Sequence, residues 1–114
     1  MTLRNPAYLR HMLDAIDRVS EAVSRTTFED FEKDWVIQDA IIRELQILGE
    51  AAGRVSRELT SSRPEIPWSE ITGLRHKLVH DYFVVDLRIV WLTATEDVPL
   101  VRPLIAKLLD DTTA

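Results

Sequence analysis

Hydrophobic residues recur along this chain at the spacing of one face of an α-helix, and no segment shows the sustained alternation of a β-strand. The first helix is predicted to begin at Asn5-Pro6, because asparagine is a good N-cap and proline suits the first helical position. Its apolar stripe indicates that the helix runs to about Arg25. Its apolar positions are Leu9, Met12, Leu13, Ile16, Val19 and Val23.

A short helical turn and then a long helix are predicted next. Thr26 and Glu29 have the spacing of a capping box. They open the acidic stretch 27–34, whose charges we interpret as a solvated face. The long helix is expected to cover residues 35–59, which at about 1.5 Å per residue would span the whole domain. Its apolar positions are Trp35, Ile41, Ile42, Leu45, Leu48, Ala52 and Val55.

Glycine and proline mark the middle of the chain. Gly49 and Gly53 lie inside the predicted long helix, where glycine is unfavourable. They either allow another helix to approach closely or are tolerated without a special role, and the sequence leaves both open. Residues 61–67 form a break, and Pro67 is expected to be the first residue of another helix, which carries residues 73–82.

Asp86 predicts the N-cap of a last helix that begins at Leu87. Pro99 and Pro103 should kink or divide this helix. The sum is an all-α fold, an up-and-down bundle of four main helices and one short helix. At 114 residues the chain is expected to form a single domain, residues 1–114. The apolar positions of the last helix are Leu87, Val90, Trp91, Leu100, Leu104, Leu108 and Leu109.

The composition narrows the classes of function. The chain has no cysteine, which excludes disulfides, thiolate metal sites and a cysteine nucleophile. No stretch approaches the ~20 apolar residues of a membrane span, and the N-terminus lacks the apolar core of a signal peptide, so we expect a cytoplasmic protein without a membrane partner. The net charge of −5 argues against broad binding of nucleic acid but leaves room for a small basic pocket. The tryptophans are interpreted as core or interface residues: Trp35, Trp68 and Trp91.

One short segment, residues 75–82, differs from the amphipathic background. It contains Arg75, His76, His80 and Tyr82 together with a lysine and an aspartate. Arginine suits an anionic phosphate because its planar guanidinium donates paired hydrogen bonds and remains charged. Histidine suits proton transfer because an unperturbed imidazole titrates near neutral pH. These four residues are the candidate functional site.

Arginine and histidine are the minimal set for cleaving RNA without a metal ion or other cofactor. RNA carries its own nucleophile, the 2′-hydroxyl. A base such as His80 can remove its proton while a cation such as Arg75 stabilises the phosphorane-like transition state. The leaving 5′-oxygen needs an acid, which His80 of another subunit, His76 or Tyr82 could supply.

The positions of the two key side chains on a helix impose a condition. Residues five apart on a straight helix differ in direction by about 140°, so Arg75 and His80 would not share a face. They can converge if the helix ends near His80, if Arg75 curls around it, or if a second subunit completes the site. We favour the second subunit, because a single copy offers few catalytic groups.

The segment resembles a known motif. Arg75 to His80 fits the Arg-x4-His motif of HEPN ribonucleases, and the extension through Tyr82 gives Arg-x4-His-x-Tyr, which resembles the HepT branch of that family. The resemblance covers nearly the whole chain. Its surroundings also resemble that branch at Ile66-Pro67-Trp68, Gly73-Leu74, Phe83-Val84-Val85-Asp86 and Leu48-Gly49-Glu50-Ala51-Ala52.

The resemblance implies a HEPN fold, a partner and a mode of regulation. Proteins of this branch are helical bundles that dimerise and bring their two motifs together, so a homodimeric, metal-independent endoribonuclease with Arg75 and His80 as catalytic residues is expected. They act as toxins of toxin–antitoxin systems and are encoded beside a minimal nucleotidyltransferase antitoxin. This partner transfers AMP from ATP onto the motif tyrosine, here Tyr82. The added phosphodiester would occupy the site and neutralise Arg75.

The residues alone leave other interpretations open. Arg75 and His80 can be structural, with ion pairs to Glu70 or Asp81. His76 and His80 have the i, i+4 spacing of metal ligands, but no third ligand is evident in the sequence, and no metal site is expected. The alternative function is a non-catalytic helical module that binds a nucleotide or forms a complex with a minimal nucleotidyltransferase.

Overall fold

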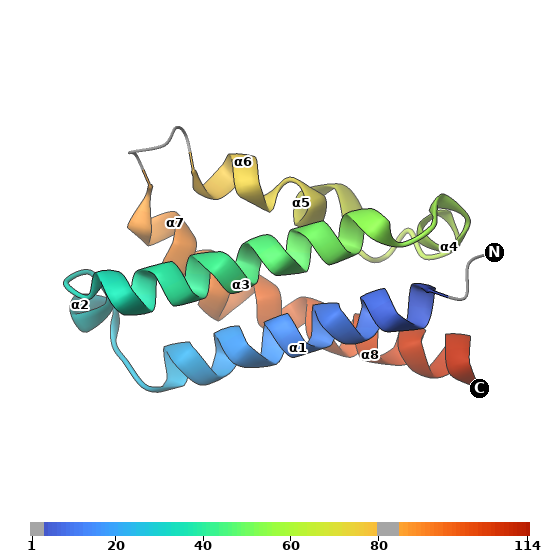
Figure 1. Cartoon of the computed structure of the whole chain (residues 1–114), viewed down its shortest axis with the longest axis horizontal. Coiled ribbons are helices and arrows are strands. Elements are labelled where there is room, and N and C mark those ends of the chain that lie inside the picture. The colour runs from blue at the N-terminus through green and yellow to red at the C-terminus, as the bar shows by residue number, and fades with distance from the viewer. Residues whose placement is uncertain (1–3, 80–84) are drawn as a thin grey trace.

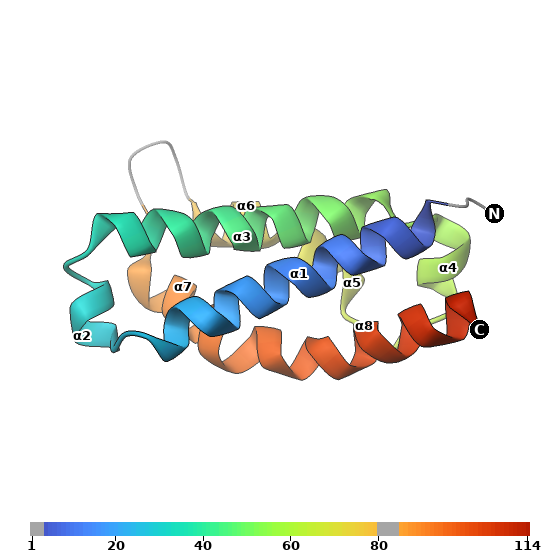
Figure 2. The same ribbon diagram turned by 60° about the horizontal axis from the view of Figure 1, so that its bottom comes forward.

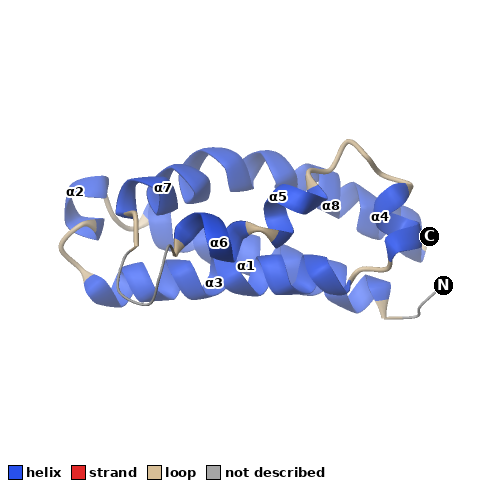
Figure 3. Cartoon of the chain, turned by 90° about the horizontal axis from the view of Figure 1, so that it is seen from above, coloured by secondary structure: helices blue, strands red, loops and turns tan. Residues whose placement is uncertain are grey.

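The structure is a computed structural model that describes residues 4–79 and 85–114. Within these ranges it contains helices and no strand, apart from one isolated bridge, and the predicted all-α bundle is confirmed (Figure 3). Three helices are long: α1 (Asn5–Ser24), α3 (Trp35–Arg54) and α8 (Val98–Thr113). The shorter elements are α2 (Phe28–Phe31), α4 (Arg57–Ser61), α5 (Trp68–Thr72), α6 (Leu74–Leu78), α7 (Leu87–Leu92) and a π-helical turn, η1 (Thr93–Asp97).

The long helices lie side by side along the 44 Å axis of the molecule. α1 lies between α3 and α8 (Figure 2), and α5 and α6 cover another side of α3 (Figure 1). The third predicted main helix, which was expected to begin at Pro67, is a pair of short helices joined at Gly73, which belongs to neither. Pro67 is the N-cap of α5 and not its first residue. No helix in the described part of the chain combines the length and the apolar character that crossing a membrane requires.

The predicted apolar stripes form the core, with two exceptions. Trp35 is 70% exposed and Leu100 is 72% exposed, so neither is the core residue that its position in a stripe predicted. Trp35 lies in the first turn of α3, and Leu100 lies off the buried face of α8, whose members follow a spacing of three and four residues. The fully buried members of the stripes include Leu9, Met12, Ile16, Val19, Ile41, Leu45, Leu48, Val90 and Leu108.

Asn5 is not the N-cap that the sequence predicted. Arg4 occupies the cap position, and Asn5 is buried in the first turn of α1. The amide oxygen of Asn5 accepts a hydrogen bond from the backbone N–H of Ser56 (3.0 Å), and its amide nitrogen donates to the Ser56 hydroxyl (2.9 Å). A residue that is locally suited to a cap instead ties α1 to the start of α4.

The long helix α3 also ends earlier than predicted, at Arg54 rather than Leu59. Val55 has an extended backbone (φ −65°, ψ 137°). The Ser56 hydroxyl then caps α4 by accepting a hydrogen bond from the N–H of Leu59 (3.3 Å). Serine offers the backbone this local alternative to a continued helix, and the two bonds to Asn5 stabilise the break further.

Two further caps test the sequence signals for helix starts. The cap of α2 is Thr27 rather than the predicted Thr26, because Thr27 has the extended backbone of a cap and its hydroxyl accepts a bond from the N–H three residues later (3.2 Å). Asp86 is confirmed as the cap of α7. Its carboxylate accepts bonds from the N–H groups two and three residues later, both at 3.1 Å.

The two glycines inside the predicted helices differ in how closely they are packed, and the two prolines differ in whether the helix is divided beside them. Gly49 lies against the backbone of α5, so close approach is found there, whereas Gly53 has only an ordinary contact with Thr72. Pro99 follows the wide turn η1, and Pro103 lies inside α8, which continues through it. The predicted division of the last helix therefore occurs before Pro99 and not at Pro103. A proline favours such a division because it lacks an N–H and its ring crowds the preceding turn.

Candidate active site

The short helix α6 presents three consecutive basic residues to the surface. Its first and last residues, Leu74 and Leu78, are buried and hold the turn against the core, because positions four apart share a face. Arg75, His76 and Lys77 lie between these anchors and are exposed. The local pattern of apolar and basic residues therefore determines which sides of α6 can meet a ligand.

Arg75 lines a surface hollow of about 540 Å³ between α3 and the pair α5–α6. Among the residues that the structure describes, none forms a hydrogen bond or an ion pair with the Arg75 side chain, so its guanidinium is available to an anion. Glu70, one of the two partners of the structural interpretation, lines a different hollow. The other residues around Arg75 are Gln46, Gly49, Glu50 and Thr72.

Sequence reasoning assigned no site role to Gln46, Glu50 or Thr72. They come from α3 and α5 and lie near Arg75 because Gly49 lets the backbone of α5 rest closely on α3. The available signal was the stretch Leu48-Gly49-Glu50-Ala51-Ala52, which resembles the HepT branch and places Glu50 directly after a helix glycine. That signal becomes informative once the helix that packs on the glycine is known.

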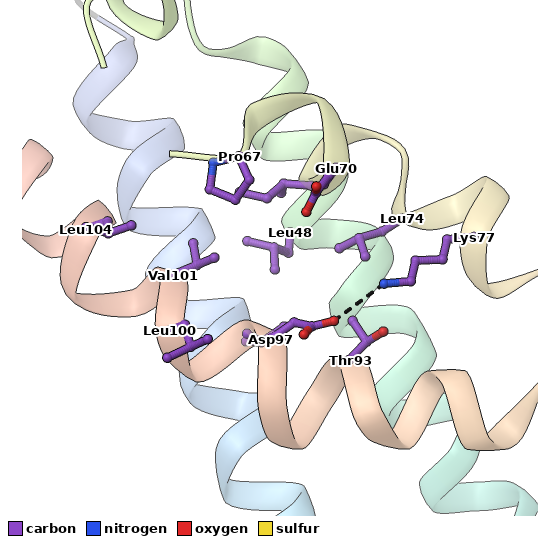
Figure 4. A pocket seen from close by; sticks show the side chains of 12 residues that line it. Leu48, Pro67, Glu70, Leu74, Lys77, Thr93, Asp97, Leu100, Val101 and Leu104 are labelled. Atoms are coloured by element: carbon purple, nitrogen blue, oxygen red, sulfur yellow. Dashed lines mark hydrogen bonds and ion pairs between the residues drawn. The ribbon is translucent and has the colours of Figure 1, made fainter. Parts of the chain in front are cut away.

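Another side of α6 borders a second hollow, which is mainly apolar and has a volume of about 240 Å³ (Figure 4). Lys77 lies at its rim, where its Nζ is 3.4 Å from the carboxylate of Asp97 in η1. The two sides of α6 thus differ in chemistry, and the side that bears Arg75 suits a phosphate. The apolar side chains of the second hollow are Leu48, Ile71, Leu74, Val98, Leu100, Val101 and Leu104.

The end of α6 bears on how Arg75 and His80 can meet. Val79 has an extended backbone (φ −123°, ψ 107°), and its N–H donates to the carbonyl of Arg75 (3.1 Å). A separation of about 140° holds only for a straight helix that continues to His80. Of the three routes to convergence, the structure therefore shows a helix that ends near His80. Val79 and Val85 form an isolated antiparallel bridge, so the chain returns close to the end of α6.

Three of the predicted residues cannot be placed. His80 and Tyr82 lie outside the described residues, as does Asp81, the other partner of the structural interpretation. His76, which has metal-ligand spacing to His80, is exposed on α6. Across residues 4–79 and 85–114, no three His, Asp or Glu side chains come close enough together to hold a metal ion.

Comparison with known proteins identifies the family. Residues 12–108 match the family model described as Ribonuclease HepT-like. The chain belongs to this family. The matched range of the HepT-like chain contains α3, α5 and α6 in full, and with them every residue that lines the Arg75 hollow.

Two relatives of this HepT-like chain align with it over most of their length. A protein of Caldanaerobacter subterraneus subsp. tengcongensis named "Putative RNase" is 38% identical over 102 residues, which cover 90% of this chain and 91% of the relative. A protein of Thermococcus cleftensis named "Probable ribonuclease HepT" is 41% identical over 101 residues, which cover 89% of this chain and 92% of the relative. No solved structure matches the chain at a significant level.

Proposed function

We propose that this HepT-like chain is an endoribonuclease that cleaves RNA without a metal ion. The observation that carries the proposal is the guanidinium of Arg75, which faces a polar hollow without a partner among the described residues. The helix that bears it ends two residues before His80 in the sequence. The names of two relatives, which contain the words RNase and ribonuclease, support the same activity.

The proposed chemistry uses the nucleophile within the substrate. His80 acts as general base and takes the proton of a ribose 2′-hydroxyl, whose oxygen attacks the adjacent phosphorus. Arg75 donates hydrogen bonds to the phosphoryl oxygens as negative charge develops on them. The bond from phosphorus to the 5′-oxygen breaks, and this oxygen takes a proton from an acid, which is His80 of a second subunit, His76 or Tyr82. A 2′,3′-cyclic phosphate and a 5′-hydroxyl result.

A homodimer would complete this site. Each chain has one histidine at the base position, and the same turnover also needs an acid. Two-fold pairing brings a second copy of Arg75 and His80 to the same phosphate if the end of α6 lies beside the symmetry axis. The exposure of residues 75–77 on α6 is compatible with such an arrangement.

We further assign the ribonuclease the role of toxin in a cytoplasmic toxin–antitoxin pair. Its antitoxin is a minimal nucleotidyltransferase that adenylylates Tyr82. In this step the tyrosine oxygen bonds to the α-phosphorus of ATP, and pyrophosphate leaves. The resulting phosphodiester carries a negative charge seven residues from Arg75 in the sequence. It would compete with RNA for the guanidinium and silence the toxin.

Cleavage of RNA by the purified chain in excess EDTA tests the activity. Arg75→Ala and His80→Ala should each slow cleavage by about 100-fold or more. Arg25→Ala removes an exposed arginine at the far end of α1 and should leave the rate unchanged. A single 2′-deoxy nucleotide at the cleaved position should stop the reaction. Undiminished cleavage by both site variants would show that the assigned residues are wrong.

The non-catalytic module makes different predictions. It would leave RNA intact, would not inhibit growth when expressed without a partner, and would still bind a nucleotidyltransferase tightly. Intact-mass spectrometry after co-expression with the neighbouring nucleotidyltransferase tests the regulation separately. Wild-type protein should gain one or more AMP units, and Tyr82→Phe, which lacks the acceptor oxygen, should lose the AMP on that residue.

A further inference from the structure

A further hollow of about 340 Å³ lies beside the one that contains Arg75. It is formed between α1 and α3, and Glu50 of α3 lines both hollows. Figure 1 shows why they adjoin, since α3 runs between α1 on one side and α5–α6 on the other. Packed helices are about 8–10 Å apart, so the two hollows are separated by the width of a single helix.

The side chains of this hollow differ from those around Arg75. Tyr8 is half-buried and packs against the core, so its ring is held in place, while His11 one turn later is exposed. Ile47 and Ala51 supply apolar surface from α3, and Arg54 supplies a cation. An aromatic ring, apolar surface and a guanidinium are the groups on which proteins stack bases and hold phosphates of single-stranded RNA.

Among the residues that the structure describes, those around the Arg75 hollow form no such stacking surface. The described residues that line it are polar or glycine and include no aromatic side chain. These described residues can therefore hold a phosphate, but none of them offers a ring on which a base could stack. The neighbouring hollow has such a ring, because Tyr8 lies on the other side of the α3 ridge formed by Glu50.

Charge on the ridge is compatible with an RNA strand that crosses it. Glu50 carries a negative charge, but its carboxylate is already paired with Arg54 one turn later (3.3 Å). Both side chains of this pair are mostly exposed, and exposed i, i+4 pairs of this kind are weak. A phosphate can therefore compete with Glu50 for the Arg54 guanidinium. The two positive charges of Arg54 and Arg75 exceed the single negative charge of Glu50 here, even though the whole chain has a net charge of −5.

We propose that the hollow formed by Tyr8, His11 and Arg54 is a nucleotide subsite of the ribonuclease. It binds the nucleotide that follows the two nucleotides flanking the cleaved linkage, with the base stacked on Tyr8 and its phosphate bound to Arg54. This inference rests on the proposed function, since Arg75 marks the place of the cleaved phosphate. It adds a determinant of substrate length and affinity that is separate from the catalytic groups.

The first test compares a dinucleotide, which has one phosphodiester and reaches only the Arg75 hollow, with a longer single-stranded oligonucleotide. Tyr8→Ala and Arg54→Ala should each lower kcat/KM on the longer RNA by about tenfold or more, and should leave dinucleotide cleavage unchanged. Tyr8→Phe keeps the ring and should behave like the wild type. Arg25→Ala is a matched control for Arg54→Ala, because Arg25 forms an equivalent i, i+4 pair with Glu21.

The second test measures affinity without cleavage. The longer oligonucleotide, with a 2′-deoxy nucleotide at the cleaved position, is titrated by fluorescence anisotropy, and circular dichroism confirms that each variant is folded. Binding that weakens about tenfold in Tyr8→Ala and Arg54→Ala but not in the two controls supports the subsite. Equal binding by all variants, or no binding by the wild type, overturns it. Failure of the wild type to cleave either substrate, with the binding differences intact, would instead refute the proposed ribonuclease activity.

Discussion

The carbonyl oxygen of Ile71 in α5 lies 2.9 Å from the position that a Cβ atom on Gly49 of α3 would occupy. A contact this short between a carbon and an oxygen is repulsive, so glycine is the residue that lets α5 rest directly on α3. Gly53, one turn later, differs, because a Cβ there would lie 3.9 Å from the Thr72 methyl. The contact at Gly49 thus fixes the distance from α3 to the helices beside the Arg75 hollow.

Gly49→Ala should therefore destabilise the fold, and Gly53→Ala should not. The new methyl group at residue 49 has to displace the backbone of α5, and overpacking of this kind costs about 1–3 kcal/mol, against a gain of about 1 kcal/mol in helix propensity. Gly53→Ala should have unchanged stability or gain up to about 1 kcal/mol. Urea unfolding measures both. RNA cleavage should fall in Gly49→Ala alone, and equal stability and activity of the two variants would contradict the packing argument.

The hydrogen bonds of the buried Asn5 amide should contribute more to the free energy of unfolding than an ordinary surface hydrogen bond does. Asn5→Ala leaves the N–H and the hydroxyl of Ser56 without their partner, and the expected loss is about 1–3 kcal/mol in the free energy of unfolding. Ser56→Ala keeps the bond from the Ser56 N–H but removes both the bond to the Asn5 amide nitrogen and the cap of α4, and should cost a similar amount. In a double-mutant cycle the two changes should not be additive, because they share the same bonds.

A serine with a purely local bond serves as the control for Asn5. The hydroxyl of Ser24 is exposed and donates to the carbonyl of Glu21 (2.7 Å) in the same helix. Ser24→Ala should change stability by no more than about 0.5 kcal/mol. If Asn5→Ala proved equally mild, the link between α1 and α4 would not hold the break at Val55 in place.

The helices and their buried faces could be predicted because they depend on residues three and four positions apart. Asp86 was predicted as a cap for the same reason, since its bonds reach only to the next turn. The end of α3 could not be predicted in this way. The local cap formed by Ser56 is reinforced there by bonds between Ser56 and Asn5, which are 51 positions apart, and local preferences carry no information about such a partner.

The candidate site was predictable to a similar extent. Arg75 was identified by residue type and motif, and the structure places it in an open polar hollow. Its neighbours Gln46 and Glu50 come from a different helix, and their proximity follows from the packing of α5 on Gly49. The sequence indicated that Gly49 could permit such packing but did not identify the helix that would use it.

The ion pair between Asp17 of α1 and Arg102 of α8 should make a small contribution to stability that disappears in acid. The two side chains form two hydrogen bonds, at 2.7 and 3.1 Å. The hydrogen bond from Arg102 holds the pKa of the Asp17 carboxyl below its usual value. Because both side chains are about half exposed, solvent limits the coupling to about 0.5–1 kcal/mol at neutral pH.

The direction of the pH dependence follows from the lowered pKa of Asp17. Its contribution is fully present above the usual aspartate value of about 3.9 and is lost as the pH falls through the lower value of the folded state. A double-mutant cycle with Asp17→Asn and Arg102→Gln, measured by urea unfolding, should give a constant coupling between pH 5 and pH 7. The coupling should shrink below about pH 3.9. A coupling that is absent at pH 7, or unchanged at pH 3, would contradict this assignment.

Arg75 and Lys77 are two residues apart on α6 and should affect RNA cleavage very differently. Arg75 faces the polar hollow, whereas Lys77 is bound to Asp97 at the rim of the apolar one. Arg75→Lys keeps the charge but loses the planar pair of donors and should lower kcat by about tenfold, against about 100-fold for Arg75→Ala. Lys77→Ala should change kcat by less than about twofold, because surface ion pairs contribute little. If Lys77→Ala were as damaging as Arg75→Ala, the phosphate would have to bind on the other side of α6, where the structure offers mainly apolar side chains.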